Sequence, residues 1–315
     1  SALVKVTGAL DGPPPAVARP AAHATTYDPK KFKNMWDDPA THSAATVDSG
    51  NDGNVLADVL GKQKDKKRMY ALEKANIFNL LCIPPYDGTD VSAMKDVGGD
   101  VLGEAAAYCQ EKRAILLVDP PKGWAKDDAR QGVPIPGLGP QTNAALYFPY
   151  IKKANSKRDK QVEAFVPCGA VAGVIARTDS VRGVWKAPAG LDATLSTVQD
   201  LAVGLTDAEN GELNPLGINC LRKIAPVGSV VWGARTTAGD DRLASQWKYL
   251  PVRRTALYIE ETLVRNVQWA VFEPNDEPLW AQLRLNIGVF MHGLFRQGAF
   301  QGQTPKEAYL VQCDS

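Results

Sequence analysis

The sequence has few of the residues from which catalytic and metal sites are commonly built. Only three histidines, His23, His42 and His292, occur among 315 residues, and they lie far apart in the chain, which leaves few parts for a histidine triad or metal site. The five cysteines never form a C-x-x-C pair, so neither a disulfide framework nor a thiolate zinc site is indicated. The phosphate-binding motif G-x-x-x-x-G-K-[ST] and the hydrolase motifs G-x-S-x-G and H-E-x-x-H are also absent. We therefore expect no metal, no cofactor and no enzymatic activity.

The sequence also has no large excess of positive or negative charge and no long apolar run. The formal net charge is +1, so no overall field draws the protein to nucleic acid or to an anionic membrane. No signal peptide is visible at the start of the sequence, and the longest charge-free stretch, 133–150, is interrupted by prolines and glycines. A membrane helix of about 20 apolar residues would not carry them. We expect neither a nucleic-acid partner nor membrane insertion, and the cysteine usage favours a reducing compartment.

What is present divides the chain into three ranges. Residues 1–68 are rich in proline, alanine, aspartate and glycine and contain the basic run KQKDKKR at 62–68. This composition predicts a turn-rich decoration. The basic run could bind a phosphate. Because no aromatic residue lies among its charges, it could also be a solvated loop.

The range 69–208 has the pattern of an α/β domain. An apolar run at 76–85 and a second at 114–121 flank an alanine-rich helical stretch at 101–112. Strand, helix and strand in this order predict a parallel unit, whose carboxyl ends often carry ligand sites. Asp87 and Asp119 follow the two strands and are either candidate catalytic acids or ordinary turn residues. An α/β enzyme built on residues 70–150 is therefore the competing hypothesis.

The range 209–315 predicts a hairpin followed by two helices. Apolar runs at 213–224 and 229–237 are separated by a short turn. The stretch 249–272 passes from extended chain into a helix, and a second helix follows Asn275 or Asp276 as N-cap. A last strand is predicted at 308–313, and we expect it to form a small sheet with the hairpin.

The second of these helices has two different faces. Apolar side chains recur at three and four residues from Trp280 to Leu294 and predict a buried stripe. The opposite face carries Arg284, His292 and Arg296, and no acidic residue occurs between positions 279 and 297. Such a face suits a negatively charged partner surface, although an ordinary solvated face would show the same spacing.

Three long strings together resemble the contractile-tail sheath family, which comprises phage tail sheaths and the sheaths of R-type pyocins and extracellular contractile injection systems. They are VEAFVPCGAVAGVIARTDSVRGVWKAPAG at 162–190, LNPLGINCLRKI with VVWGARTT at 213–237, and the stretch at 252–314 that begins VRRTALYIEETLVRN. The middle stretch from 71 to 121 is also similar to injection-system sheaths. Members of the family carry extended arms at both ends, so the resemblance implies that such arms lie outside this sequence.

The resemblance implies an α+β fold in which an inner sheath-lattice domain at 209–315 has a small sheet completed by neighbouring subunits, and an outer α/β domain occupies 69–208. It implies a subunit that polymerises around an inner tube and contracts to drive the tube through a target envelope. The partners would be further copies in stacked hexameric rings, the tube protein, and baseplate and terminal cap proteins, assembled in the bacterial cytoplasm as part of a phage tail or tail-like particle. For the tube contact we expect Arg284, His292 and Arg296. The residues expected in strand exchange are Asn219, Leu221, Val230, Trp232, Tyr309 and Val311.

Apart from the enzyme, one further alternative remains open. A monomeric binding module would use the proline-rich loop at 133–140 as its ligand site. Native size separates both alternatives from a sheath, since only a sheath subunit forms long tubes.

Overall fold

The computed structural model describes residues 60–85, 96–132, 135–156 and 159–313. The chain divides into two units, Ser1–Val55 and Leu56–Ser315, and all described residues belong to the second. The predictions for residues 1–59 and for Asp87 lie outside the described part. In the basic run at 62–68, Gln63–Asp65 forms a short 3-10 helix. Its last residue, Arg68, begins a second 3-10 helix that ends at Lys74.

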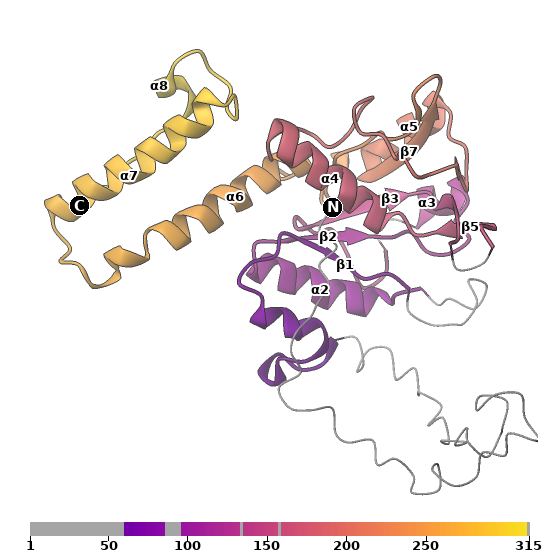
Figure 1. Cartoon of the computed structure of the whole chain (residues 1–315), viewed down its shortest axis with the longest axis horizontal. Helices are drawn as coiled ribbons and strands as arrows, with labels where there is room; N and C mark the ends of the chain where they lie inside the picture. Colours follow the sequence, from indigo (N-terminus) through magenta and orange to yellow (C-terminus); the bar gives the residue numbers. More distant parts are fainter. Residues whose placement is uncertain (1–59, 86–95, 133–134, 157–158, 314–315) are drawn as a thin grey trace, which may run out of the picture. The chain divides into compact units, whose positions relative to one another are not determined.

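A five-stranded sheet forms the centre of the described unit (Figure 1). Its strand order is β1-β2-β3-β7-β8. The strands are β1 Leu80–Cys82, β2 Ile115–Val118, β3 Ala144–Phe148, β7 Ile218–Ile224 and β8 Gly228–Val231. The first four run parallel and β7 and β8 form an antiparallel hairpin. The predicted parallel unit and the predicted hairpin are therefore both confirmed.

Helices cover both faces of this sheet, which explains why β2 and β3 are apolar and buried along their whole length. On one face α2, Gly99–Glu111, buries Leu102 and Tyr108 with Leu116 and Leu146. On the other face α4, Cys168–Arg182, buries Val171 with alternate residues of the same strands, and the start of α6, Leu250–Asn266, joins it. The central strands thus take part in two cores.

A second, three-stranded sheet has the order β5-β4-β6. Its strands are β4 Ile151–Ala154, β5 Val162–Phe165 and β6 Asp200–Leu201. Two further short helices, α3 at Lys126–Gln131 and α5 at Asp207–Leu213, bury Ala129 and Leu213 in the core on the α2 face of the large sheet. The capping box between Thr206 and Glu209 begins α5. The fold is therefore a mixed α+β fold with one large and one small sheet.

The small sheet is not the one that the sequence suggested. The hairpin β7–β8 belongs to the large sheet through β3, and in the described chain residues 309–313 pair with no strand. The prediction that the hairpin and 308–313 form a sheet of their own was wrong for the chain by itself, since Pro305–Ala308 is the short helix α8 and the extended residues after it have no partner strand. The large sheet also joins the ranges 69–208 and 209–315, so a boundary near 209 would separate strands of one sheet.

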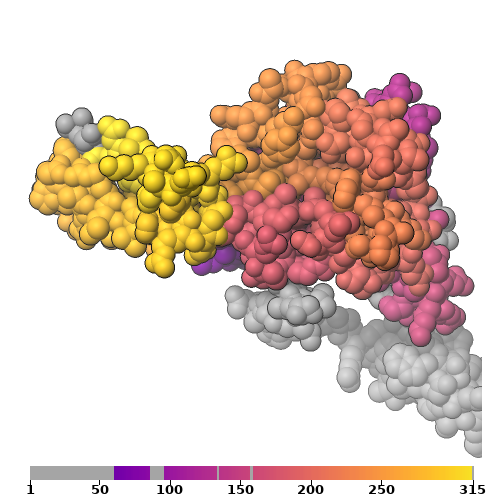
Figure 2. Space-filling model, turned by 90° about the horizontal axis from the view of Figure 1, so that it is seen from above, coloured from indigo at the N-terminus to yellow at the C-terminus, as the bar shows by residue number. Residues whose placement is uncertain are grey.

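The last part of the described chain is helical. After α6 come a 3-10 turn at Gln268–Phe272 and the helix α7 at Glu277–Arg296. Asp276 caps α7 by accepting a hydrogen bond from the amide of Leu279 at 3.2 Å, as one of the two N-cap candidates predicted. Within the described residues, no helix is long and apolar enough to cross a membrane. Figure 2 shows α7 and α8, drawn in yellow, at the surface of the molecule.

Candidate functional site

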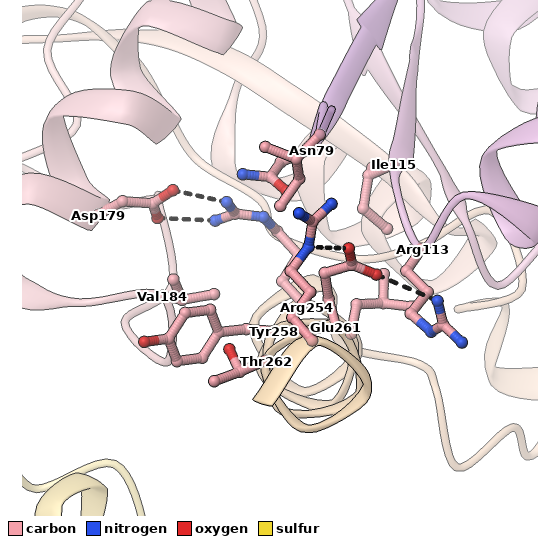
Figure 3. A pocket seen from close by; sticks show the side chains of 12 residues that line it. Asn79, Arg113, Ile115, Asp179, Val184, Arg254, Tyr258, Glu261 and Thr262 are labelled. Atoms are coloured by element: carbon pink, nitrogen blue, oxygen red, sulfur yellow. Dashed lines mark hydrogen bonds and ion pairs between the residues drawn. The ribbon is translucent and has the colours of Figure 1, made fainter. Parts of the chain in front are cut away.

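The helix α6 is fastened to the body through a buried ion pair. Arg254 donates from its two terminal nitrogens to both carboxylate oxygens of Asp179 on α4, at 2.8 and 2.6 Å. Figure 3 shows the two side chains joined directly by these two hydrogen bonds in the lining of a pocket. The Arg254 side chain is only 6% exposed and that of Asp179 is 24% exposed. Two parallel charge-assisted hydrogen bonds fix an orientation as well as a distance, so this pair sets how α6 lies on α4.

A second cluster holds α6 further along its length. Glu261 accepts a hydrogen bond from Arg113 at 3.1 Å and one from Arg265, four residues on, at 2.5 Å. Arg265 also donates to the side chain and carbonyl of Asn76, just before β1. Burial acts to raise the pKa of Glu261, but the two guanidinium groups outweigh it and the net pKa is lowered. Glu261 is therefore a stable anion between two cations.

The pocket of Figure 3 lies between these two ion-pair clusters and has a volume of about 170 Å³. Each of its charged lining residues has a partner in the lining: Asp179 binds Arg254, and Glu261 binds Arg113 and Arg265. Since each charge is already compensated, the pocket offers no free charge to a ligand. We assign it to the attachment of α6.

The first turns of α6 carry a third contact. Arg253 is 8% exposed, donates from Nε to the Asn143 side chain at 3.0 Å and lies over the ring of Trp247 at 4.7 Å from its centroid. The apolar residues Ala256 and Leu263 of α6 are only half-buried. Two arginines with bonded partners thus lie in the most buried part of α6. The spacing of apolar residues in the sequence does not predict their burial.

The helix α7 is much less covered. Of its 20 residues only Leu294 is buried, and the predicted stripe from Trp280 onwards is half-buried. The rings of Phe290 and Tyr258 of α6 lie 6.2 Å apart. Leu285 and Val289 are 65% and 66% exposed. A helix with this much exposed apolar surface has area available for another molecule.

The three residues predicted to contact a tube differ in their surroundings. Arg284 is half-buried and donates to the carboxylate of Glu277 and to the backbone carbonyl of Cys313, so it ties the last described residues to α7. His292 and Arg296 are exposed on the same helix. Two of the three are therefore placed to meet a partner, while Arg284 has a role within the chain.

The residues predicted for strand exchange fall into two groups. Asn219, Leu221 and Val230 are fully buried inside the large sheet. Asn219 donates to the carbonyls of Leu146 and Arg235 and accepts from the Arg235 amide at 2.6 Å. Trp232 is half-buried beside Arg222, its ring centroid 6.0 Å from the guanidinium carbon.

The outer edge of β8 is also occupied by this chain. Leu195 donates to the carbonyl of Ser229 at 2.9 Å and Val231 donates to the carbonyl of Ala193 at 3.0 Å. A guest strand would have to displace this segment to pair with β8. The geometry therefore disfavours strand exchange at the hairpin.

The segment 309–313 is the extended stretch without a strand partner in the described chain. Tyr309 adopts extended backbone angles and packs its ring 6.0 Å from that of Phe300. Val311 is half-buried, and Leu310 between them is 82% exposed. Of the six residues predicted for strand exchange, Tyr309 and Val311 thus lie in extended chain that pairs with no described strand. The Tyr309 amide already donates to the carbonyl of Pro305 at 3.1 Å.

The candidate acid Asp119 lies at the end of β2, as predicted. Its Oδ1 accepts a hydrogen bond from the amide of Cys168 at 2.8 Å, while Oδ2 is buried without a partner. Burial raises the pKa of Asp119 to about 6, and the hydrogen bonds from Cys168 lower it only in part. Within the described residues no group of three metal-ligating side chains comes together.

The loop at 133–140 was the candidate ligand site of a binding module. Its residues Ile135 and Leu138 are buried in the core, so these side chains pack inside the protein.

Comparison with known proteins identifies the class. The family described as "Phage tail sheath protein central domain" matches residues 139–237. The tail sheath protein of Vibrio phage KVP40 is 30% identical over 124 residues, which are 39% of this chain and 18% of that protein. Both matches are to sheath proteins of contractile tails, and neither is to an enzyme.

Solved structures extend the similarity over most of the chain. The helical sheath of the anti-feeding prophage (AFP) in its contracted state has 33% identity and a TM-score of 0.62, covering 80% of this chain and 65% of that one. The sheath complex of PVC, an extracellular contractile injection system, in its contracted state has 27% identity and a TM-score of 0.63, covering 81% and 65%. Residues 139–237 thus match the phage tail sheath family, and the chain is homologous to the AFP and PVC sheaths. It spans less than two thirds of the length of these relatives.

Proposed function

We propose that the chain is part of a contractile sheath subunit, which polymerises around an inner tube and contracts to drive the tube through a target envelope. The observation that carries this proposal is the 33% identity with a helical sheath in its contracted state over 80% of the chain. On this proposal the partners are further copies in stacked hexameric rings, a tube protein, and baseplate and terminal cap proteins. Assembly takes place in the bacterial cytoplasm.

The structure supports different roles for the α/β body and for the helices that follow it. The α/β body has two buried cores, and the ion pairs of Arg254 and Glu261 fasten α6 to it. We assign lattice building to the part from α6 onwards rather than to the whole range 209–315, because β7 and β8 are interior strands of the body sheet. The exposed side chains of His292 and Arg296 are the proposed tube contacts.

Contraction then requires only relative movement of whole subunits. A subunit whose helices are tied to its body by compensated buried charges moves as a rigid body, since breaking such a pair leaves a charge without a partner. The extended backbone of 309–313, which pairs with no strand of the described chain, supplies the link between neighbours by β-augmentation. No bond is broken in this mechanism.

The test is the assembly of the intact gene product with its tube protein, imaged by negative-stain electron microscopy. We expect long tubes from the unaltered protein. Val311→Pro removes one backbone amide from the linking segment, and we expect it to abolish tubes, whereas Val311→Ala, which keeps the amide, preserves them. Monodisperse monomers from the unaltered protein would refute the sheath function. Intact tubes from the proline variant would refute only the strand link.

A further inference from the structure

A hollow of about 330 Å³ lies beside the last turns of α4. Its lining comes from the end of α4 and from the loop that follows this helix, and none of its residues lines the pocket of Figure 3. Three cationic side chains line the hollow, those of Arg177, Arg182 and Lys186, together with a single carboxylate, that of Asp192. Three cations against one carboxylate leave an excess of two positive charges in this place.

The guanidinium of Arg177 is held by neutral groups. One of its terminal nitrogens donates to the backbone carbonyls of Asp192 and Thr194, at 3.3 and 2.8 Å, and these carbonyls orient the group without cancelling its charge. Within the described part of the chain, Nε and the other terminal nitrogen of Arg177 have no acceptor. A guanidinium has five N–H donors, so Arg177 keeps donors for a ligand that carries oxygen atoms.

The other two cations are weakly compensated as well. The Nζ atom of Lys186 donates to the backbone carbonyl of Ala187 at 3.3 Å, which is again a neutral partner. Arg182 lies 3.9 Å from the carboxylate of Asp192, and the two side chains are 58% and 83% exposed, so water weakens this pair. The hollow therefore differs from the pocket of Figure 3, where each charged side chain has a bonded partner of opposite sign.

Two features of the hollow act against an anion. One is the carboxylate of Asp192, and the other is the C-terminal end of α4 at Arg182, because a helix carries about half a negative elementary charge at that end. Together they are smaller than the charge of three cations. The potential in the hollow is therefore positive, although the net charge of the whole chain is only +1.

We propose that Arg177, Arg182 and Lys186 form a binding site for an oxyanion of the phosphate class, either free or carried by a small organic molecule. A phosphate dianion matches the excess of two positive charges, and its oxygens accept charge-assisted hydrogen bonds from guanidinium and ammonium groups. Val181 and three alanines of the loop also line the hollow, and an apolar lining with a few placed polar groups is typical of small-molecule sites. The inference rests on local geometry and does not depend on the proposed sheath function.

The experiment titrates the full chain with inorganic phosphate and, separately, with adenosine monophosphate, in isothermal titration calorimetry at constant ionic strength. We expect saturable binding of both anions. Tighter binding of the nucleotide would assign the apolar lining to the organic part of the ligand, whereas equal affinities would assign the site to a free anion. A chain that binds neither anion, or that binds only a polyglutamate peptide, would overturn the proposal.

Variants test the charges one at a time. Lys186→Gln and Arg182→Gln each remove one cation and should weaken phosphate binding about fivefold. Asp192→Asn removes the opposing carboxylate and should strengthen phosphate binding roughly two- to fivefold, a gain that damage to the fold cannot produce. Arg177 is left unaltered, because its hydrogen bonds hold the loop.

The matched control is Lys153→Gln, which removes one positive charge at an exposed residue of β4 outside the hollow. It should leave phosphate binding unchanged. Equal weakening in Lys153→Gln and Lys186→Gln would show that only net charge matters, and no gain in Asp192→Asn would show that the anion binds elsewhere. Either result would contradict the site.

Discussion

At the scale of single residues, Arg254 is the side chain on which the attachment of α6 depends. Arg254→Ala leaves the carboxylate of Asp179, on a side chain that is 24% exposed, without its bidentate partner. We expect a loss of roughly 2–4 kcal/mol in the free energy of unfolding, because removing one member of a largely buried pair strands the other charge. Urea unfolding followed by circular dichroism measures it.

The matched control is an exposed ion pair of the same chain. Lys223 and Asp200 lie 3.1 Å apart with side chains 60% and 51% exposed. Lys223→Ala should leave the urea midpoint unchanged, since water replaces the lost partner. Equal losses in the two variants would show that the Arg254 pair is no more than a surface contact.

Asp119 predicts a pH dependence of stability. Its pKa is about 6 in the folded protein, against an ordinary value of 3.8. The folded state thus binds the proton more tightly, so the stabilisation is complete below pH 4 and is lost as the pH rises through 6. Asp119→Asn cannot lose it, and the variant should gain about 3 kcal/mol relative to the unaltered protein between pH 4 and 7.

Urea unfolding of both proteins at each pH tests this difference. Titrations elsewhere in the chain cancel when the two free energies of unfolding are subtracted. A difference that stays flat from pH 4 to 7 would mean that the Asp119 carboxyl ionises as it does in water.

At the scale of elements, local sequence signals predicted a large part of the fold. The apolar runs before Pro84 and Pro120 became β1 and β2, the short turn at 225–228 gave the hairpin, and Asp276 caps α7. Each of these depends on neighbours in the sequence: apolar runs, turn residues and side chains that bind nearby amides. Such signals are readable without knowing the rest of the chain.

Long-range pairing was not predictable in the same way. The pairing of β3 with β7 joins Leu146 to Ile218, and nothing in either stretch encodes the other. The hairpin was therefore assigned to a separate sheet, and Asn219 was predicted to take part in strand exchange although it is buried within the large sheet. The segment 309–313 has the composition of a strand, but a strand exists only with a partner. Arg254 of α6 was missed as an anchor because its acidic partner, Asp179, comes from another element.

The helix α7 carries the proposed tube contact, which charge reversal tests. Arg296→Glu places an acid on a face that otherwise has none between positions 279 and 297, and we expect roughly three- to tenfold weaker association with the tube. Co-sedimentation of sheath protein with purified tubes measures it. Arg284 is not used, because its reversal would also repel Glu277.

The control for this helix is Lys153→Glu, an equal change of charge at an exposed residue of β4. It should leave tube association unaltered. If both reversals weaken association equally, the effect belongs to net charge and not to α7.

At the scale of the whole molecule, the net charge of +1 means that electrostatic attraction to a tube must be local. The proposed contact through His292 and Arg296 is exposed to solvent, so salt screens it; the Debye length falls from about 10 Å at 0.1 M to about 3 Å at 1 M. The proposed links between subunits are backbone hydrogen bonds of 309–313, which salt screens little. Raising the salt should therefore free the tube from the sheath while sheath tubes persist. Electron microscopy across a salt series distinguishes the two contacts. If the tube separates only when the sheath itself falls apart, one kind of interaction holds both contacts. The division between α7 and the linking segment would then be wrong.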